Sequence, residues 1–217
     1  LEKYIGGLPS TKRKENWKDV SPEFPEGKVV VDVPKNSEQQ SRVAMVGEDD
    51  FKWKRQDGQG FSMLMSILRI KLRESMREDQ GGVYGVSISG SPEKFPEPKF
   101  SIVSQWGCSP DNIEKLAQTV LDEMNKIKKE GPTDTDLNKV KETMIRERET
   151  QVRENTFWLS HLQNHYQYGS RILSLEEYKG LVTSMTAKNI QAVAKRYLDT
   201  ENYVRVALTP KPDLQAK

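Results

Sequence analysis

The periodicity of apolar residues changes several times along this chain, and the order of these changes constrains the fold more than any other feature. Five short segments alternate in polarity or are rich in β-branched residues, and they predict strands at 29–33, 41–47, 83–90, 100–107 and 203–210. Pro34 is expected to end the first strand. Between the second and third strands, apolar residues recur at spacings of three and four, as on one face of a helix: Phe61, Leu64, Leu68, Leu72 and Met76.

The segment between the fourth and fifth strands predicts a run of helices. An apolar stripe extends from Ile113 to Ile127, a Gly-Pro pair ends that helix, and Thr133 or Thr135 caps the next one. Further helical segments follow, and Thr186 caps the last of them. The order β, β, α, β, β, helices, β predicts an α+β domain, in which helices cover one face of a mixed, mainly antiparallel sheet.

The first 28 residues differ from the rest of the chain. LEKYIGGLPS is typical of the last turn of a helix ended by glycine and proline, and the polar stretch after it is typical of an extended linker. We therefore expect residues 1–28 to be the tail of a preceding domain and a linker, and residues 29–217 to form one domain. The chain opens without a methionine, so we expect it to be a piece of a longer protein.

Charge and cysteine content exclude several classes of function. The chain has 34 Lys and Arg residues interspersed with 32 Asp and Glu residues. This balanced distribution of charge does not indicate binding to nucleic acid or to a membrane surface. No apolar run approaches the roughly 20 residues of a membrane span. The single cysteine, Cys108, excludes an internal disulfide framework, and we expect it to be a small buried apolar residue.

The motif HLQNH is the one candidate for a metal site. His161 and His165 share a helix face, as metal-binding pairs do. The inverted zincin pattern is His-x-x-Glu-His, however, and here Asn164 stands at the glutamate position. A neutral amide cannot take a proton from zinc-bound water, so we expect no metal site in this chain.

A second candidate lies in the stretch LRESMREDQGGVYGV, where a helix end, a two-glycine turn and a strand start follow one another. In one interpretation, Tyr84 is a half-buried core residue and Arg77 is favoured by the helix dipole alone. In the other, the turn folds the strand back beside the helix end. The guanidinium of Arg77 and the phenol of Tyr84 then point into one cleft, where they can grip a carbonyl or an oxyanion.

The pattern R-x-x-x-G-x-x-Y after LxxxLRxxxRED resembles the C-terminal half of the insulinase/pitrilysin family of zinc metallopeptidases. KYIGGLPS, FWLSHL and TAKNIQAVAKRYL are similar to further segments of that family, in the same order. The resemblance implies a processing-peptidase-like metallohydrolase domain, the last of a multi-domain zinc metalloendopeptidase. It also implies that zinc is bound by an N-terminal catalytic half and not by this chain, which is inactive alone.

The resemblance further implies roles for two residues and two partners. Arg77 would bind a backbone carbonyl of the peptide substrate, and Tyr84 would donate its phenol to the tetrahedral oxyanion. The partners would be that peptide and the N-terminal catalytic half of the same protease, in the bacterial periplasm or cytoplasm. Arg73, one turn before Arg77, is a further candidate for the same cleft, although a salt bridge is the role we expect. The alternatives are a catalytically degenerate scaffold subunit of the same fold and a binding domain unrelated to proteolysis.

Overall fold

A computed structural model describes residues 2–9, 11–14, 16, 18, 20, 22–78, 83 and 85–211 of the chain. The described residues form a five-stranded sheet of order β1-β5-β2-β4-β3. Its strands are β1 (Lys28–Asn36), β2 (Ser41–Asp50), β3 (Gly85–Glu93), β4 (Lys99–Cys108) and β5 (Tyr203–Pro210). β1 and β5 run parallel, and the other neighbouring pairs are antiparallel. The predicted α+β class with a mixed, mainly antiparallel sheet is confirmed.

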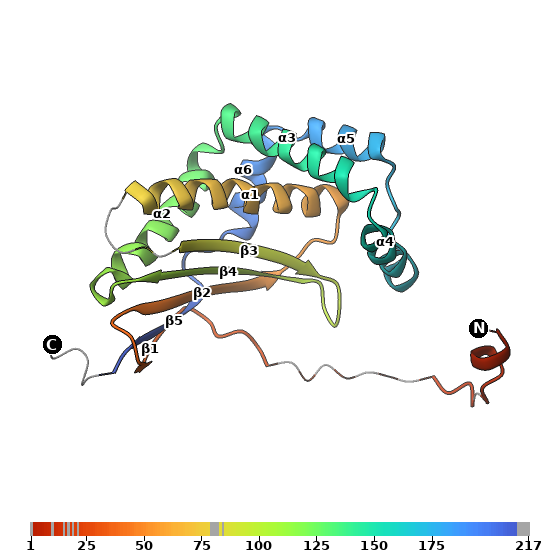
Figure 1. The fold of residues 1–217 in the computed structure, drawn as a ribbon, viewed down its shortest axis with the longest axis horizontal. Helices are drawn as coiled ribbons and strands as arrows, with labels where there is room; N and C mark the ends of the chain where they lie inside the picture. The colour runs from red at the N-terminus through yellow and green to blue at the C-terminus, as the bar shows by residue number, and fades with distance from the viewer. Residues whose placement is uncertain are drawn as a thin grey trace.

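The helices lie on one side of the sheet: α1 lies over the strands, α3 and α5 lie above α1, and α4 lies at one end (Figure 1). They are α1 (Arg55–Glu78), α2 (Ile113–Glu130), α3 (Asp134–Gln151), α4 (Asn155–Tyr168), α5 (Leu175–Ser184) and α6 (Ala187–Tyr197). A short 3-10 turn, η2 (Pro110–Asn112), precedes α2. None of the described helices is both long enough and apolar enough to cross a membrane.

The core forms between α1 and the helix-facing side of the sheet. The apolar stripe predicted for α1 is confirmed, because Leu64, Leu68 and Leu72 are completely buried. α1 therefore lies in the middle of the fold, with α2, α3 and α6 packed around it and β3 beneath it. Cys108 is also completely buried, as expected, and burial raises the pKa of its thiol.

Two predicted helix caps are present with their hydrogen bonds. The Thr133 hydroxyl accepts from the backbone N–H of Asp136 at the start of α3, which decides between the two threonines proposed for this cap. Thr186 and Asn189 form a capping box at the start of α6. Gly131 ends α2 with φ of +76°, a conformation that a residue with a side chain rarely adopts.

The prediction for Pro34 is wrong. Pro34 lies inside β1, which continues to Asn36. β1 is an edge strand of the sheet that the described residues form, and a proline is tolerated in an edge strand because one side of such a strand carries no ladder bonds. The register of β1 against β5 shifts between Pro34 and Asn36.

The residues before β1 have little contact with this core. The chain begins with a single π-turn, η1 (Glu2–Gly6), which carries exposed Tyr4 and Ile5. From there it runs to β1 beneath the sheet without joining it (Figure 1). Phe24 is half-buried, whereas the other described residues up to Gly27 are exposed.

Candidate functional site

The end of α1 and the start of β3 form the region in which sequence analysis placed the candidate site. Arg77 lies in the last turn of α1, and its side chain is not among the described parts of the chain. Tyr84, like Gly81 and Gly82, lies outside the described residues. The end of α1 and the start of β3 lie at the same end of the sheet (Figure 1). The prediction that Arg77 and Tyr84 face one space remains a prediction.

The entry into β3 depends on a glycine that sequence analysis did not single out. Gly85 has φ of +145°, in the region that residues with a Cβ rarely adopt. From Gly85 onward, residues of β3 alternate between the helix-facing side and the open side of the sheet, and Ile88 is buried under α1. The direction in which β3 leaves the preceding turn is therefore set at Gly85.

Arg69 on α1 contacts the free edge of β3. β3 is bonded to β4 on one side only, so its other edge has backbone groups that face no strand. Arg69 donates from Nη2 and Nε to the backbone carbonyl of Ile88, at 3.2 and 3.4 Å. Arg73 is exposed one turn further along, and Arg77 follows after four more residues. Residues four apart share a helix face, so Arg69 and Arg73 lie along one side of α1, and Arg77 follows at the same spacing in the last turn of the helix.

A shallow hollow of about 730 Å³ opens on the side of the sheet away from the helices. Its lining comes from the start of β3 and from the neighbouring parts of β2, β4 and β5. Apolar residues Ala44, Val206 and Leu208 form part of its surface, and Arg42 and Gln105 supply polar groups. This set of side chains can hold an extended peptide or an apolar segment. It contains no pair of groups able to perform general acid–base hydrolysis.

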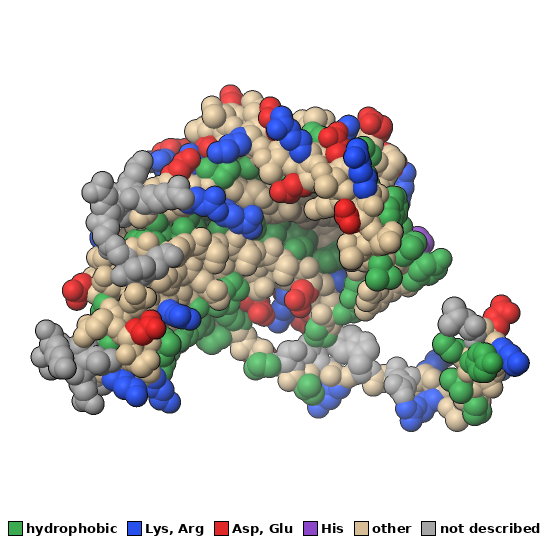
Figure 2. Space-filling model, viewed as in Figure 1, with side chains coloured by type: hydrophobic (Ala, Val, Ile, Leu, Met, Phe, Trp, Pro, Cys, Tyr) green, Lys and Arg blue, Asp and Glu red, His purple; other side chains and the backbone are tan. Residues whose placement is uncertain are grey.

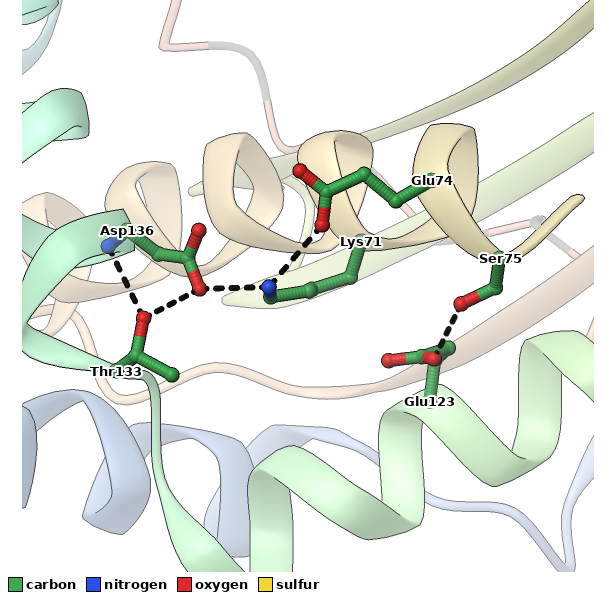
Figure 3. A network of polar contacts seen from close by, with 6 residues as sticks. All are labelled: Lys71, Glu74, Ser75, Glu123, Thr133 and Asp136. Atoms are coloured by element: carbon green, nitrogen blue, oxygen red, sulfur yellow. Dashed lines mark hydrogen bonds and ion pairs between the residues drawn. The ribbon is translucent and has the colours of Figure 1, made fainter. Parts of the chain in front are cut away.

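Two polar links fix the C-terminal half of α1 against its neighbours (Figure 3). The Lys71 ammonium lies 2.8 Å from a carboxylate oxygen of buried Asp136 on α3, and 3.1 Å from Glu74. The Thr133 hydroxyl donates to the same Asp136 oxygen at 2.6 Å. One turn further along α1, the Ser75 hydroxyl donates to Glu123 on α2. These links hold the part of α1 that carries Arg73 and Arg77.

The contact between Lys71 and Asp136 also shifts the pKa values of both side chains. Burial raises the pKa of Asp136, but the hydrogen bonds from Lys71 and Thr133 outweigh burial and hold this pKa below its ordinary value. The hydrogen bond to Asp136 raises the pKa of Lys71, against the opposing effect of burial. Both groups are therefore charged at neutral pH, and the link is an ion pair.

The two histidines are engaged in separate contacts. The Nδ1–H of His161 donates to the Phe157 carbonyl at 2.9 Å, which leaves Nε2 to accept from Arg148 at 3.1 Å. His165 Nδ1 donates to the Ser170 carbonyl at 2.9 Å. A guanidinium beside Nε2 opposes a metal cation there. Among the described residues, no group of three potential metal ligands exists, so the residues present do not fit a zinc ion.

Arg148 is a residue whose role sequence analysis missed. It lies in a charged helical segment that is typical of a solvated face. Its guanidinium instead lies 4.0 Å from the ring centroid of Tyr178 and 4.9 Å from that of Phe157. Through these contacts Arg148 connects α3 to α4 and α5. Apolar periodicity carries no signal for such a contact, because it joins three separate helices.

Comparison with known proteins identifies relatives of this fold. A sequence model of the family described as "Peptidase M16 inactive domain" matches residues 1–144. A curated protein of Arabidopsis thaliana, named zinc protease PQQL-like, is 26% identical over 164 residues, which cover 68% of this chain and 17% of that protein. The chain therefore spans about a sixth of the length of this relative.

Solved structures share the fold at low sequence identity. A mutant of the ferredoxin protease FusC, in complex with Arabidopsis ferredoxin, matches with a TM-score of 0.78 and 16% identity, over 97% of this chain and 23% of that chain. The periplasmic protease PqqL from Escherichia coli matches with a TM-score of 0.74 and 21% identity, over 86% of this chain and 21% of that chain. The first half of PqqL matches with a TM-score of 0.75 and 15% identity, over 100% of this chain and 49% of that chain.

Proposed function

Because the chain belongs to the peptidase M16 inactive-domain family, we propose that it is the C-terminal, non-zinc domain of a zinc metalloendopeptidase. In this proposal, the domain closes a peptide chamber over a catalytic half that lies elsewhere in the protein. That half binds the zinc ion, which activates the attacking water.

Arg77 and Tyr84 are the residues that this domain contributes to the reaction. Arg77 donates to a backbone carbonyl of the peptide beside the scissile bond, and Tyr84 donates its phenol to the oxyanion of the tetrahedral intermediate. The observation that carries this assignment is the contact of Arg69 on α1 with the Ile88 carbonyl at the free edge of β3, because Arg73 and Arg77 follow Arg69 at four-residue spacing on the same helix.

The substrate class that fits is an extended peptide or an unfolded segment of a protein. FusC in complex with ferredoxin is a protease bound to a protein, which supports a polypeptide substrate for the complete protein here. PqqL is described as periplasmic, which favours the periplasm over the cytoplasm among the two compartments expected.

The experiment that tests this function uses the full-length protein loaded with zinc. Peptide cleavage by the wild type is compared with cleavage by Tyr84→Phe and Arg77→Ala, with unfolding curves recorded for each. We expect kcat for Tyr84→Phe to fall by a hundredfold or more, which corresponds to about 3 kcal/mol of lost transition-state stabilisation. Tyr203→Phe, which alters a half-buried tyrosine on β5, is the matched control and retains its kcat.

The same experiment separates this proposal from a scaffold role. If the full-length protein binds no zinc and cleaves no peptide, the domain belongs to a degenerate subunit. If it cleaves peptides at an unchanged rate in both variants, Arg77 and Tyr84 are structural residues and the domain contributes only a wall of the chamber.

A further inference from the structure

One side of α1 changes from apolar to polar contacts along its length. Four residues follow one another at four-residue spacing on this side: Met63, Ile67, Lys71 and Ser75. Met63 and Ile67 are completely buried and belong to the core. Lys71 and Ser75 instead form the two polar links to α3 and α2 (Figure 3). The C-terminal half of α1, which ends at Glu78, is therefore fixed on this side by directional contacts.

The link between Ser75 and Glu123 lies closest to the end of α1. The Ser75 hydroxyl donates to Glu123 Oε1 at 2.5 Å, a short distance typical of a hydroxyl bonded to a carboxylate. The two side chains point toward one another from α1 and α2 (Figure 3). The neighbours of Glu123 on α2 include Val120 and Met124, which are buried in the core. Glu123 is thus held on a well-packed helix, which makes it a rigid support for Ser75.

The second carboxylate oxygen of Glu123 is not stabilised by this arrangement. Glu123 Oε2 is buried and has no hydrogen-bond partner among the residues that the structure describes. A buried acceptor without a partner lowers stability, and an apolar side chain of similar size avoids that cost. Such groups are uncommon in native proteins and require an explanation other than stability. The contribution that a carboxylate makes here, and an apolar residue cannot, is the bond to Ser75.

We propose that Ser75 and Glu123 are positioning residues for Arg77. Their hydrogen bond fixes the position and orientation of the last turn of α1, which carries Arg77 two residues after Ser75. This role rests on the function proposed above for Arg77, which is to bind a backbone carbonyl of the peptide substrate. Neither Ser75 nor Glu123 needs to touch the substrate, because both act through the backbone of α1.

The apolar contacts of this turn do not fix it by themselves. Met76 is buried in the core, about 100° around the helix axis from Ser75. A methionine side chain is flexible and packs almost equally well after a small displacement. A hydrogen bond depends on both distance and angle, so the bond to Glu123 resists the rotation that Met76 permits. Together, the two contacts hold the turn from two directions.

A small displacement of this turn is expected to affect the reaction. A misplacement of about 1 Å can lower the rate of an enzyme by about a hundredfold, because the reacting groups must be held in a narrow range of geometry. Removing the Ser75 hydroxyl leaves the contacts of Met76 and Lys71 in place, so the displacement should be smaller than 1 Å. We therefore expect Ser75→Ala to lower kcat/KM for peptide cleavage by about tenfold.

A double-mutant cycle in the full-length, zinc-loaded protein tests whether this effect acts through Arg77. Peptide cleavage is measured for wild type, Ser75→Ala, Arg77→Ala and the double variant. The loss of about tenfold caused by Ser75→Ala should shrink to less than about twofold when Arg77 is already alanine. An equal loss in both backgrounds would overturn the proposal. The matched control is Ser66→Ala, because the Ser66 hydroxyl donates to the Ser62 carbonyl of the same helix; this variant should retain its kcat/KM.

Substitutions of Glu123 separate positioning from stability. Glu123→Met removes the acceptor of the Ser75 bond together with the unpartnered oxygen. We expect it to lower kcat/KM as much as Ser75→Ala does, while its unfolding midpoint in urea stays at or above that of wild type. Glu123→Gln keeps an oxygen that can accept from Ser75, so its kcat/KM should stay within about twofold of wild type. A midpoint of Glu123→Met that falls together with kcat/KM would indicate an ordinary structural role and contradict the proposal.

The same measurements separate a failure of this proposal from a failure of the proposed function. If Arg77→Ala lowers kcat/KM and Ser75→Ala does not, Arg77 acts on the substrate without support from Ser75, and only the positioning role is overturned. If Arg77→Ala leaves kcat/KM unchanged in a protein that cleaves peptide, the function proposed for Arg77 is wrong, and the positioning role is overturned with it.

Discussion

Replacing Lys71 by methionine removes the ammonium that pairs with buried Asp136. The Nζ–Oδ2 distance is 2.8 Å, the Asp136 side chain is 9% exposed and the Lys71 side chain is 25% exposed. Loss of one partner from a fully buried pair costs about 3–5 kcal/mol, whereas an exposed pair contributes less than about 1 kcal/mol. Thr133 still donates to Asp136 after the substitution. We therefore expect Lys71→Met to lower the free energy of unfolding by about 2 kcal/mol.

Urea unfolding at neutral pH measures this loss, as a lower midpoint with an unchanged slope. Lys126→Met, the same substitution at an exposed position of α2, is the control and should change stability by less than about 0.5 kcal/mol. Adding Asp136→Asn to Lys71→Met removes the unpaired charge and should recover part of the loss. A loss below about 0.5 kcal/mol in Lys71→Met would refute the reasoning, because the link would then behave as an exposed pair.

The stability difference between wild type and Lys71→Met depends on pH in a way that follows from the two shifted pKa values. Asp136 has a lowered pKa, so its contribution is complete above the ordinary carboxyl pKa of about 3.9 and is lost as pH falls through the lower folded value. Lys71 has a raised pKa, so its contribution is complete below about 10.4 and is lost as pH rises through the folded value. The stability difference between wild type and Lys71→Met should be flat between these limits and shrink beyond both.

Three further changes test the packing of the domain. Gly90→Ala places a Cβ 2.9 Å from the Phe61 ring and should lower the free energy of unfolding by about 1–3 kcal/mol. Gly58→Ala, within α1, places a Cβ that meets no atom within 4 Å and should raise the free energy of unfolding by about 0.5–1 kcal/mol. Urea unfolding distinguishes these opposite effects. Arg148→Met removes the contacts that hold α4, so hydrogen exchange in α4 should accelerate by tenfold or more while exchange in α1 is unchanged. Thr186→Ala removes a capping box and should lower the free energy of unfolding by about 1 kcal/mol, measured by the same unfolding assay.

Sequence periodicity was sufficient to predict the layers of this fold. The five strands, α1 and the two threonine caps follow from local patterns, because alternation and capping depend on residues close together in the chain. The prediction that Pro34 ends β1 is wrong because the effect of a proline on a strand depends on the position of that strand in the sheet. A proline breaks a central strand but is tolerated at an edge, and the order of strands is a property of the whole fold.

The candidate site was only partly accessible from sequence. Arg77 and Tyr84 are predicted only through family resemblance, since a helix-end arginine and a strand tyrosine have adequate structural explanations of their own. Arg69 was not found, because its contact with the Ile88 carbonyl joins residues 19 positions apart. Rejecting HLQNH as a metal site required only the missing glutamate. The structure adds the physical reason that Arg148 donates to the nitrogen a metal would need.

The buried face of β5 cannot be predicted from the alternation of its residues alone. In YVRVALTP, alternation identifies two faces and suggests that the valines face the core while the arginine faces water. The structure reverses this, because Arg205 is buried on the helix side, where its guanidinium lies 2.9 Å from Glu114 and 3.3 Å from Asp32. Arg205 is stabilised on the helix side by these two carboxylates, whereas Val206 on the opposite side is 38% exposed. Alternation therefore identifies the two faces of β5, but which of them is buried depends on residues of α2 and β1 that are distant in the sequence.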